Sequence, residues 1–457
     1  MIAAKLNQFM HFAGAVRVDI SVSLDWDSRP RFQSRDMHTR ARRVWRHSAT
    51  LRISRLTKAR QRPLSAVEML DGQHRDTQAS QGVAALRHPN GKGSPMTQFE
   101  LLADIAAPIL GKFAERENIP PAAPLPISEW VAMALLQKSV RRDAPALALG
   151  AAATLLRLDP DKFWRRALCI AYEDIGLADL DTVTSALAAV QGKRFRAQHG
   201  GEWQVAAKLT LRLCQAPKCR AADDLLIASA YHPALDGLRR DIASEALSDH
   251  LRRIEQSGAL LGRALAVWHA TGSRRGHIYK DKQRPFGHPA AVFATLRSAG
   301  IEDDIVTIAE RGFRRVREVL CANLCLLHPL LPNGSLPTED DEFPAATMNR
   351  RGVPTFALDM FSHEGRNALG RFLGGRNDTA RWIKHNVPAQ RRIKLLGHAL
   401  FRIESGLVKR RVRWPVGDSL RLLADSGFSG MPTDTTVELL QMLRSDLSAL
   451  DKERADA

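Results

Sequence analysis

The sequence has few of the residues that favour β-strands. Its 457 residues include only 3 Tyr and 16 Phe, whereas Ala, Leu and Arg, which favour helices, are abundant. With 44% hydrophobic and 25% charged residues, the chain can bury a sizeable core, which excludes a wholly disordered chain and a small disulfide-stapled domain. The composition predicts an all-α protein, built as a multi-helix bundle or stack.

Cysteine and long apolar runs are also scarce. Five cysteines in a chain of this length argue against a disulfide framework and for a reducing compartment. The longest nearly uncharged apolar stretch covers residues 144–156, well short of the ~20 residues that span a bilayer. No apolar signal segment follows the short basic start. We therefore expect a cytoplasmic protein with no transmembrane helix and no membrane partner.

Acidic residues are in the minority, above all at the front of the chain. The formal net charge is +18, and residues 1–95 hold 17 Lys or Arg against 7 Asp or Glu. Between Arg35 and Arg62 there are ten bases and one acid, with too few apolar positions to offset the entropy of ordering. Residues 1–95 are therefore predicted to be a disordered basic arm. Two interpretations stay open: a tail that binds nucleic acid, or sequence upstream of a functional start at Met96.

Helical periodicity organises the rest into a helical domain over residues 96–330 and a basic helical domain over 347–457. The acidic, Pro- and Gly-containing segment 331–346 is predicted to link them. Ser128 and the Asp159-Pro160 pair are predicted helix starts. A polar basic loop is predicted over 272–287. Its residues 274–280 could bind a phosphate group, and the alternative is an ordinary surface loop. The predicted helices cover 97–117, 128–142, 144–157, 160–175, 181–190, 203–215, 221–231, 234–256, 258–270, 288–299 and 303–329.

Two blocks carry a specific combination of residue types. Residues 135–143 read LLQKSVRRD and residues 163–179 read FWRRALCIAYEDIGLAD. With the turn APKCR at 216–220, they resemble the helical region that follows the ATPase core in the RarA (also called MgsA) family of clamp-loader-like AAA+ proteins of replication-fork maintenance. The resemblance covers roughly residues 130–231. It implies a helical region used for self-association, or for docking an AAA+ ATPase partner.

The chain departs from that family at its catalytic core. A phosphate-binding loop ends Gly-Lys followed by Ser or Thr, but the Gly-Lys pairs at Gly91, Gly111 and Gly192 are followed by Gly93, Phe113 and Arg194. We therefore expect no ATPase activity and no cofactor.

The acids of the second block, Glu173 and Asp174, end a predicted helix, where the helix dipole disfavours negative charge. They are expected to pair with a cation from another helix or subunit. The alternative to a binding role is that they form salt bridges within the domain and fix the packing of its helices. Arg166 and Glu173, seven residues apart, should share a helix face. The candidate residues for oligomer contacts or helix packing are Lys138, Arg141, Arg142, Arg165, Arg166, Glu173, Asp174 and Lys218.

A second basic run lies between Arg381 and Arg413, with ten Lys or Arg against one acid. Phosphate-neutralising charge interleaved with flat rings is typical of nucleic-acid surfaces. The alternative is a solvated helix face whose aromatic side chains point into the core. The candidate nucleic-acid-binding residues are Arg381, Lys384, Arg391, Arg392, Lys394, Lys409, Arg410, Arg411, Arg413, Trp382 and Trp414.

Two other clusters contain residue types that can form chemical sites. Cys321, Cys325 and His328 share a predicted helical face but lack the spacing and fourth ligand of a zinc site, so core cysteines are expected and no metal. His363 and Glu364 follow Ser362, which can cap a helix and so explains the composition without catalysis.

These patterns together predict a non-catalytic accessory protein of replication or recombination type that binds DNA without sequence preference. The alternatives are an enzyme with a site near His363 and Glu364, or a pure protein-interaction module that partners a separate AAA+ ATPase.

Overall fold

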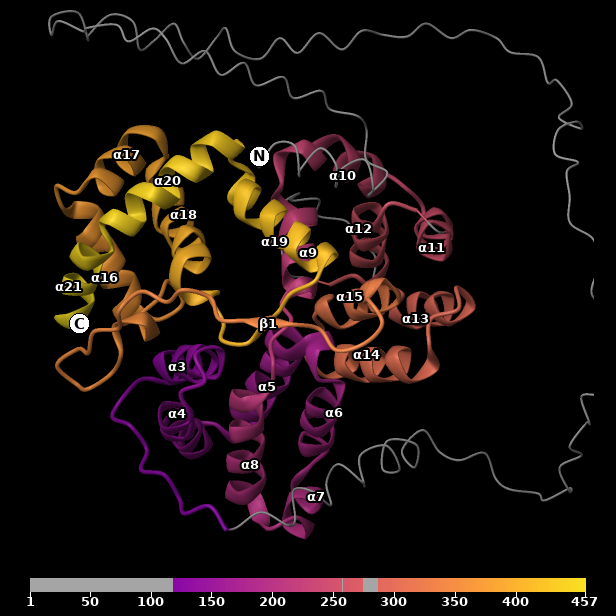
Figure 1. Cartoon of the computed structure of the whole chain (residues 1–457), viewed down its shortest axis with the longest axis horizontal. Helices are drawn as coiled ribbons and strands as arrows, with labels where there is room; N and C mark the ends of the chain where they lie inside the picture. The colour runs from indigo at the N-terminus through magenta and orange to yellow at the C-terminus, as the bar shows by residue number, and fades with distance from the viewer. Residues whose placement is uncertain (1–117, 257, 274–286) are drawn as a thin grey trace, which may run out of the picture. The chain divides into compact units, whose positions relative to one another are not determined.

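The computed structural model describes residues 118–256, 258–273 and 287–457, and these are all-α as predicted (Figure 1). The predictions made for residues 1–95, 97–117 and 274–280 concern residues outside the described part. Among the described residues, no helix has both the length and the apolar character needed to cross a membrane.

The first group of helices begins at the predicted caps. The side chain of Ser128 accepts a hydrogen bond from the backbone of Val131, and that of Asp159 accepts one from Lys162. These caps satisfy amides that the first helical turn leaves unpaired. The group consists of α3 (Glu129–Arg141), α4 (Pro145–Leu158), α5 (Pro160–Ile170), α6 (Leu180–Ala189), α7 (Lys193–Gln198) and α8 (Gly201–Gln215).

The middle group differs from the sequence prediction at two breaks. The helix predicted over 234–256 is divided into α10 and α11, and the one predicted over 303–329 is divided at Arg317, whose φ of 60° is left-handed. The group consists of α9 (Ala221–Tyr231), α10 (Asp236–Ala243), α11 (Leu247–Glu255), α12 (Leu260–Thr271), α13 (Pro289–Ser298), α14 (Asp303–Val316) and α15 (Leu320–Leu327).

The segment predicted as a linker is held in place by polar contacts. Its strand β1 (Thr338–Glu339) pairs antiparallel with β2 (Arg411–Val412), so that Thr338 lies opposite Val412. Asp341, whose side chain is 7% exposed, forms ion pairs with Arg411 at 2.6 Å and Arg421 at 2.7 Å. The remaining helices are α16 (His363–Gly374), α17 (Asp378–Asn386), α18 (Ala389–Leu400), α19 (Pro415–Gly427), α20 (Thr433–Ser445) and α21 (Leu447–Ala455).

The apolar side chains gather in two clusters. The larger extends from α3 to the segment around Leu358 and includes Leu420 and Leu423 of α19, which packs against α9 (Figure 1). The smaller lies among α16, α17, α18, α20 and α21. The domain boundary at 331–346 stays a prediction, because two cores in contact do not show whether either folds alone.

Candidate functional site

The helix that carries the motif acids changes its winding just before them. After Ile170, α5 continues as one π-helical turn, η2 (Ala171–Ile175), which ends at Gly176 with a φ of 51°. A Cβ atom on Gly176 would lie 2.8 Å from the carbonyl oxygen of Cys219, so only glycine fits here without movement. Such wide turns often occur at functional sites, and this one places Glu173 and Asp174 inside the protein.

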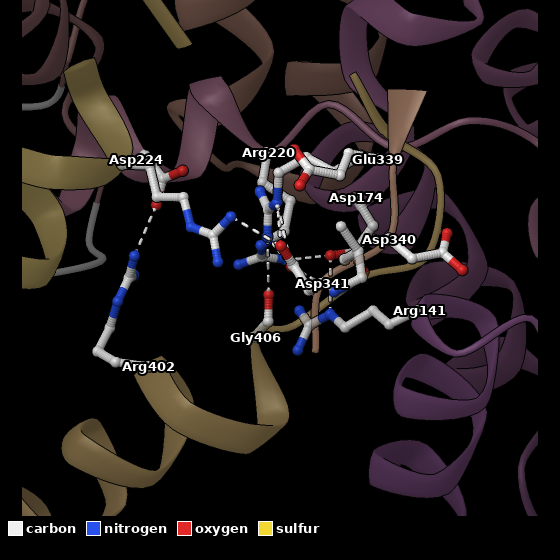
Figure 2. A network of polar contacts seen from close by, with 12 residues as sticks. Arg141, Asp174, Arg220, Asp224, Glu339, Asp340, Asp341, Arg402 and Gly406 are labelled. Atoms are coloured by element: carbon white, nitrogen blue, oxygen red, sulfur yellow. Dashed lines mark hydrogen bonds and ion pairs between the residues drawn. The ribbon is translucent and has the colours of Figure 1, made fainter. Parts of the chain in front are cut away.

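Asp174 is the centre of a buried ion-pair cluster, which we define as Arg141, Glu173, Asp174, Arg220 and Asp223. Figure 2 shows Arg141, Asp174 and Arg220 of this cluster. Asp174 is completely buried and accepts a hydrogen bond from Nε of Arg141 at 2.8 Å. Arg220 bonds the same carboxylate, and the second motif acid, Glu173, pairs with Arg141 at 2.8 Å. The expected cation from another helix is therefore Arg141 of α3.

The cluster surrounds an aromatic ring and reaches the C-terminal helices. Guanidinium groups of Arg141, Arg220 and Arg402 lie 5.3, 5.0 and 5.6 Å from the ring centre of Phe401, within the range of cation–π attraction. Arg402 also pairs with Asp224 of α9 at 3.1 Å (Figure 2). The first block, the second block and the π-helical turn η7 (Phe401–Ser405) thus meet at one place.

Sequence reasoning missed Arg220 and Asp223. Arg220 lies at the end of the APKCR turn, and Asp223 follows it by three residues, the spacing at which helical side chains meet. The sequence alone could therefore have predicted that these two side chains pair. Burial raises the pKa of the Asp223 carboxyl to about 6 against the opposing attraction of Arg220, and the nearby acids Glu173 and Asp224 add to the rise.

The other motif bases are also engaged inside the chain. Lys138 pairs with Asp359 at 2.8 Å and donates to the carbonyl of Phe356, and burial lowers its pKa. Lys218 is buried and donates to the carbonyl of Cys214, and its pKa falls to about 8 for the same reason. Remaining contacts are those of Arg142 with the Phe356 ring, Arg165 with the Val316 carbonyl and Arg166 with Gln137.

A pocket of about 370 Å³ opens beside the ion-pair cluster. Residues of α3, α9, α18, η7 and the segment 359–361 line it. Arg166 and Glu173 both line it. Two aromatic side chains of the lining are strongly exposed, Trp130 at 54% and Phe361 at 61%.

The alternative catalytic segment has the structure of a helix cap. The hydroxyl oxygen of Ser362 accepts a hydrogen bond from the backbone of Gly365 at 3.0 Å. His363 is exposed, and its ring contacts Asn367. Neither His363 nor Glu364 lines the pocket, so the capping explanation accounts for this segment.

The two cysteines weighed as metal ligands lie in the core, as expected. Cys321 and Cys325 are fully buried on α15, and burial raises the pKa of the Cys325 thiol to about 12. Within the described residues, no cluster of His, Cys, Asp and Glu side chains could hold a metal ion.

The basic run divides into exposed and internally paired parts. Trp414 and Arg411 are buried, Arg410 pairs with Asp143 at 3.1 Å, and Arg413 pairs with Asp418 at 2.8 Å. These four side chains are engaged within the chain, whereas Lys409 is exposed. Trp382 is half-buried against the smaller core. The exposed part, which we call the α17–α18 basic face, consists of Arg381, Lys384, Arg391, Lys394 and the half-buried Arg392.

Two histidines near these elements are held neutral. Burial lowers the pKa of His232 to about 4, with Arg239 adding to the effect, and burial lowers that of His398 to about 4, with Lys394 adding to it. The unfolded chain takes up these protons near pH 6.5 and the folded chain only near pH 4, so stability falls as pH drops through this window.

We expect His232→Asn to flatten the pH dependence of stability between pH 6.5 and 4. Asn can still accept the hydrogen bond that His232 Nδ1 accepts from the backbone of Ala234, but it does not titrate. For each pH unit in this window, the free energy of unfolding of the variant should change by about 1.4 kcal/mol less than that of the parent chain. Urea denaturation at several pH values measures it. The exposed His363→Asn should leave the profile of the parent chain, and an unchanged profile in His232→Asn would contradict the prediction.

Comparison with protein families, with curated proteins and with solved structures finds no match to this chain.

Proposed function

We propose that this protein is a non-catalytic accessory protein that binds DNA through the α17–α18 basic face, without sequence preference. The observation that carries the proposal is the unengaged charge on this face. Within the described residues, the side chains of Arg391 and Lys394 are exposed and make no hydrogen bond or ion pair. Free cations on one surface release counterions when they meet phosphates, and this release drives sequence-tolerant binding.

The residues around Arg391 and Lys394 add positive charge to this face, and a single acid opposes it. In the part of the chain that the structure describes, Lys384 reaches only backbone carbonyls, those of Gly374 and Gly375, at 3.3 and 3.4 Å. The acid between Arg376 and Lys394 is Asp378, which pairs with Arg381 on the surface. An exposed pair of this kind is weak, so Arg381 can exchange it for a phosphate.

The test replaces Arg381, Lys384, Arg391 and Lys394 by Ala in the full chain. Each lost phosphate contact lowers the slope of log affinity against log salt by about 0.9 for double-stranded DNA. We therefore expect the magnitude of the slope to fall by about 3.6. Between 50 and 200 mM salt, the variant should then lose roughly 150-fold less affinity than the parent chain. Fluorescence anisotropy of labelled DNA in a salt series measures the slope.

The matched control removes the same charge from other surfaces. It carries Ala at four exposed bases of α10, α11, α14 and α21: Arg240, Arg252, Arg315 and Lys452. If both variants lose the same slope, the charge acts through the whole protein and not through this face. If the α17–α18 variant keeps the slope of the parent chain, the proposal fails.

The resemblance to the RarA family supports a second part of the proposal, that residues 130–231 take part in self-association or in docking of an AAA+ ATPase partner. The motif residues themselves are engaged in the ion-pair cluster and its neighbours. Docking would therefore use the exposed residues of these helices, and light scattering after size exclusion measures the self-association.

A further inference from the structure

The pocket beside the ion-pair cluster has a wide apolar surface and no described side chain that fills it. Its apolar lining includes Leu226, Ile227 and Ala230 of α9, together with Met360 and Phe361. Its volume of about 370 Å³ is in the range of sites for small organic ligands. Trp130 and Phe361 expose more than half of their surface, which costs free energy unless a ligand covers them.

Three of the four bases that line the pocket have carboxylate partners. Arg141 pairs with Glu173 and Asp174, Lys138 pairs with Asp359, and Arg402 pairs with Asp224. The three lining acids are Glu173, Asp223 and Asp359. Glu173 and Asp359 pair with the lining bases Arg141 and Lys138, and Asp223 pairs with the buried Arg220 outside the lining.

Arg166 is the exception. Within the described residues it forms no ion pair, and its guanidinium donates to neutral acceptors: the amide oxygen of Gln137 at 3.2 Å and the sulfur of Met133 at 3.8 Å. A half-buried guanidinium with donors still free is a ready partner for an anion, because it binds carboxylates and similar oxyanions through a fork of N–H groups.

We propose that this pocket binds an amphipathic organic anion, whose flat apolar body lies against Trp130 and Phe361 and whose single negatively charged head group pairs with Arg166. A second charge on the ligand would meet Glu173 or Asp223 and be disfavoured, so the site selects a singly charged molecule. His398, which also lines the pocket, is neutral at pH 7 because burial lowers its pKa to about 4, and so it adds no charge. The site is separate from DNA binding by the α17–α18 basic face and does not depend on it.

The experiment uses a pair of fluorescent probes of similar shape, the sulfonate 8-anilinonaphthalene-1-sulfonate and its uncharged analogue N-phenyl-1-naphthylamine. The full chain should bind the sulfonate saturably at one site. Arg166→Gln should weaken sulfonate binding about tenfold or more, as expected for a lost charge-assisted hydrogen bond, and leave the neutral probe unchanged. Trp130→Ala and Phe361→Ala should weaken both probes.

Three further experiments distinguish loss of the site from a folding defect. Arg166→Lys retains the charge and should recover much of the sulfonate binding. In the unaltered chain, 1-naphthoate should displace the sulfonate, and the cation 1-naphthylmethylamine should not. Val437→Ala, at another exposed apolar residue, should change neither probe. Equal displacement by the two naphthalene compounds, unaltered sulfonate binding in Arg166→Gln, or the absence of saturable binding would overturn the proposal.

Discussion

Asp174→Asn should lower the free energy of unfolding by about 3–5 kcal/mol, the usual cost of removing one partner from a buried ion pair. The carboxylate of Asp174 is fully buried and is shared by Arg141 and Arg220, which are themselves buried. An amide of the same shape keeps the volume but leaves the two guanidinium groups with one negative charge fewer. Urea denaturation followed by circular dichroism measures the change.

The control for this prediction is the exposed pair of Asp378 and Arg381. Asp378→Asn makes the same chemical change in solvent, where ion pairs contribute less than about 1 kcal/mol. If the two variants have the same stability, the cluster around Asp174 does not hold the helices together in the way its burial indicates.

Local features of the fold could be predicted from sequence. Ser128, Asp159 and Ser362 each cap the helix that follows, because a cap depends only on residues three apart. The break after α14 could not be predicted, since it occurs at Arg317 in a left-handed conformation and no glycine marks the place. Packing around the turn, and not the local sequence, sets that conformation.

The candidate site was predictable in part for the same reason. The acids Glu173 and Asp174 pointed to a cation from another helix, because they end a helix whose dipole disfavours them. Arg220, which lies 46 residues from Asp174, could not be paired with it from spacing alone. Likewise, Arg411 is buried and pairs with Asp341, which lies 70 residues earlier in the chain. Nothing in the sequence of the basic run distinguishes Arg411 from the exposed Arg391.

Arg454→Met should destabilise the protein about as strongly as Asp174→Asn, by roughly 3–5 kcal/mol. Arg454 of α21 is fully buried and donates to both oxygens of Glu404 in η7, at 2.9 Å each. Burial works to raise the pKa of Glu404, but Arg454, with help from Lys138 and Arg142, lowers it overall. Without the guanidinium, Glu404 would be a buried charge with its main partner gone. Thermal and urea denaturation measure the loss.

A double variant separates the cost of an orphaned charge from the value of the pair. When Glu404→Met is added to Arg454→Met, both charges are gone and apolar side chains fill the space, which in other buried pairs is close to neutral. We therefore expect the double variant to be more stable than Arg454→Met by about 2 kcal/mol or more. Equal stability of the two would mean that packing of the long Arg454 side chain, and not its charge, holds α21 on the protein.

The pH dependence of stability gives a second test of the same pair. Because the pKa of Glu404 is lowered in the folded state, the stability from this pair is present above pH 4.5 and is lost as the pH falls below it. The double variant should not show that loss.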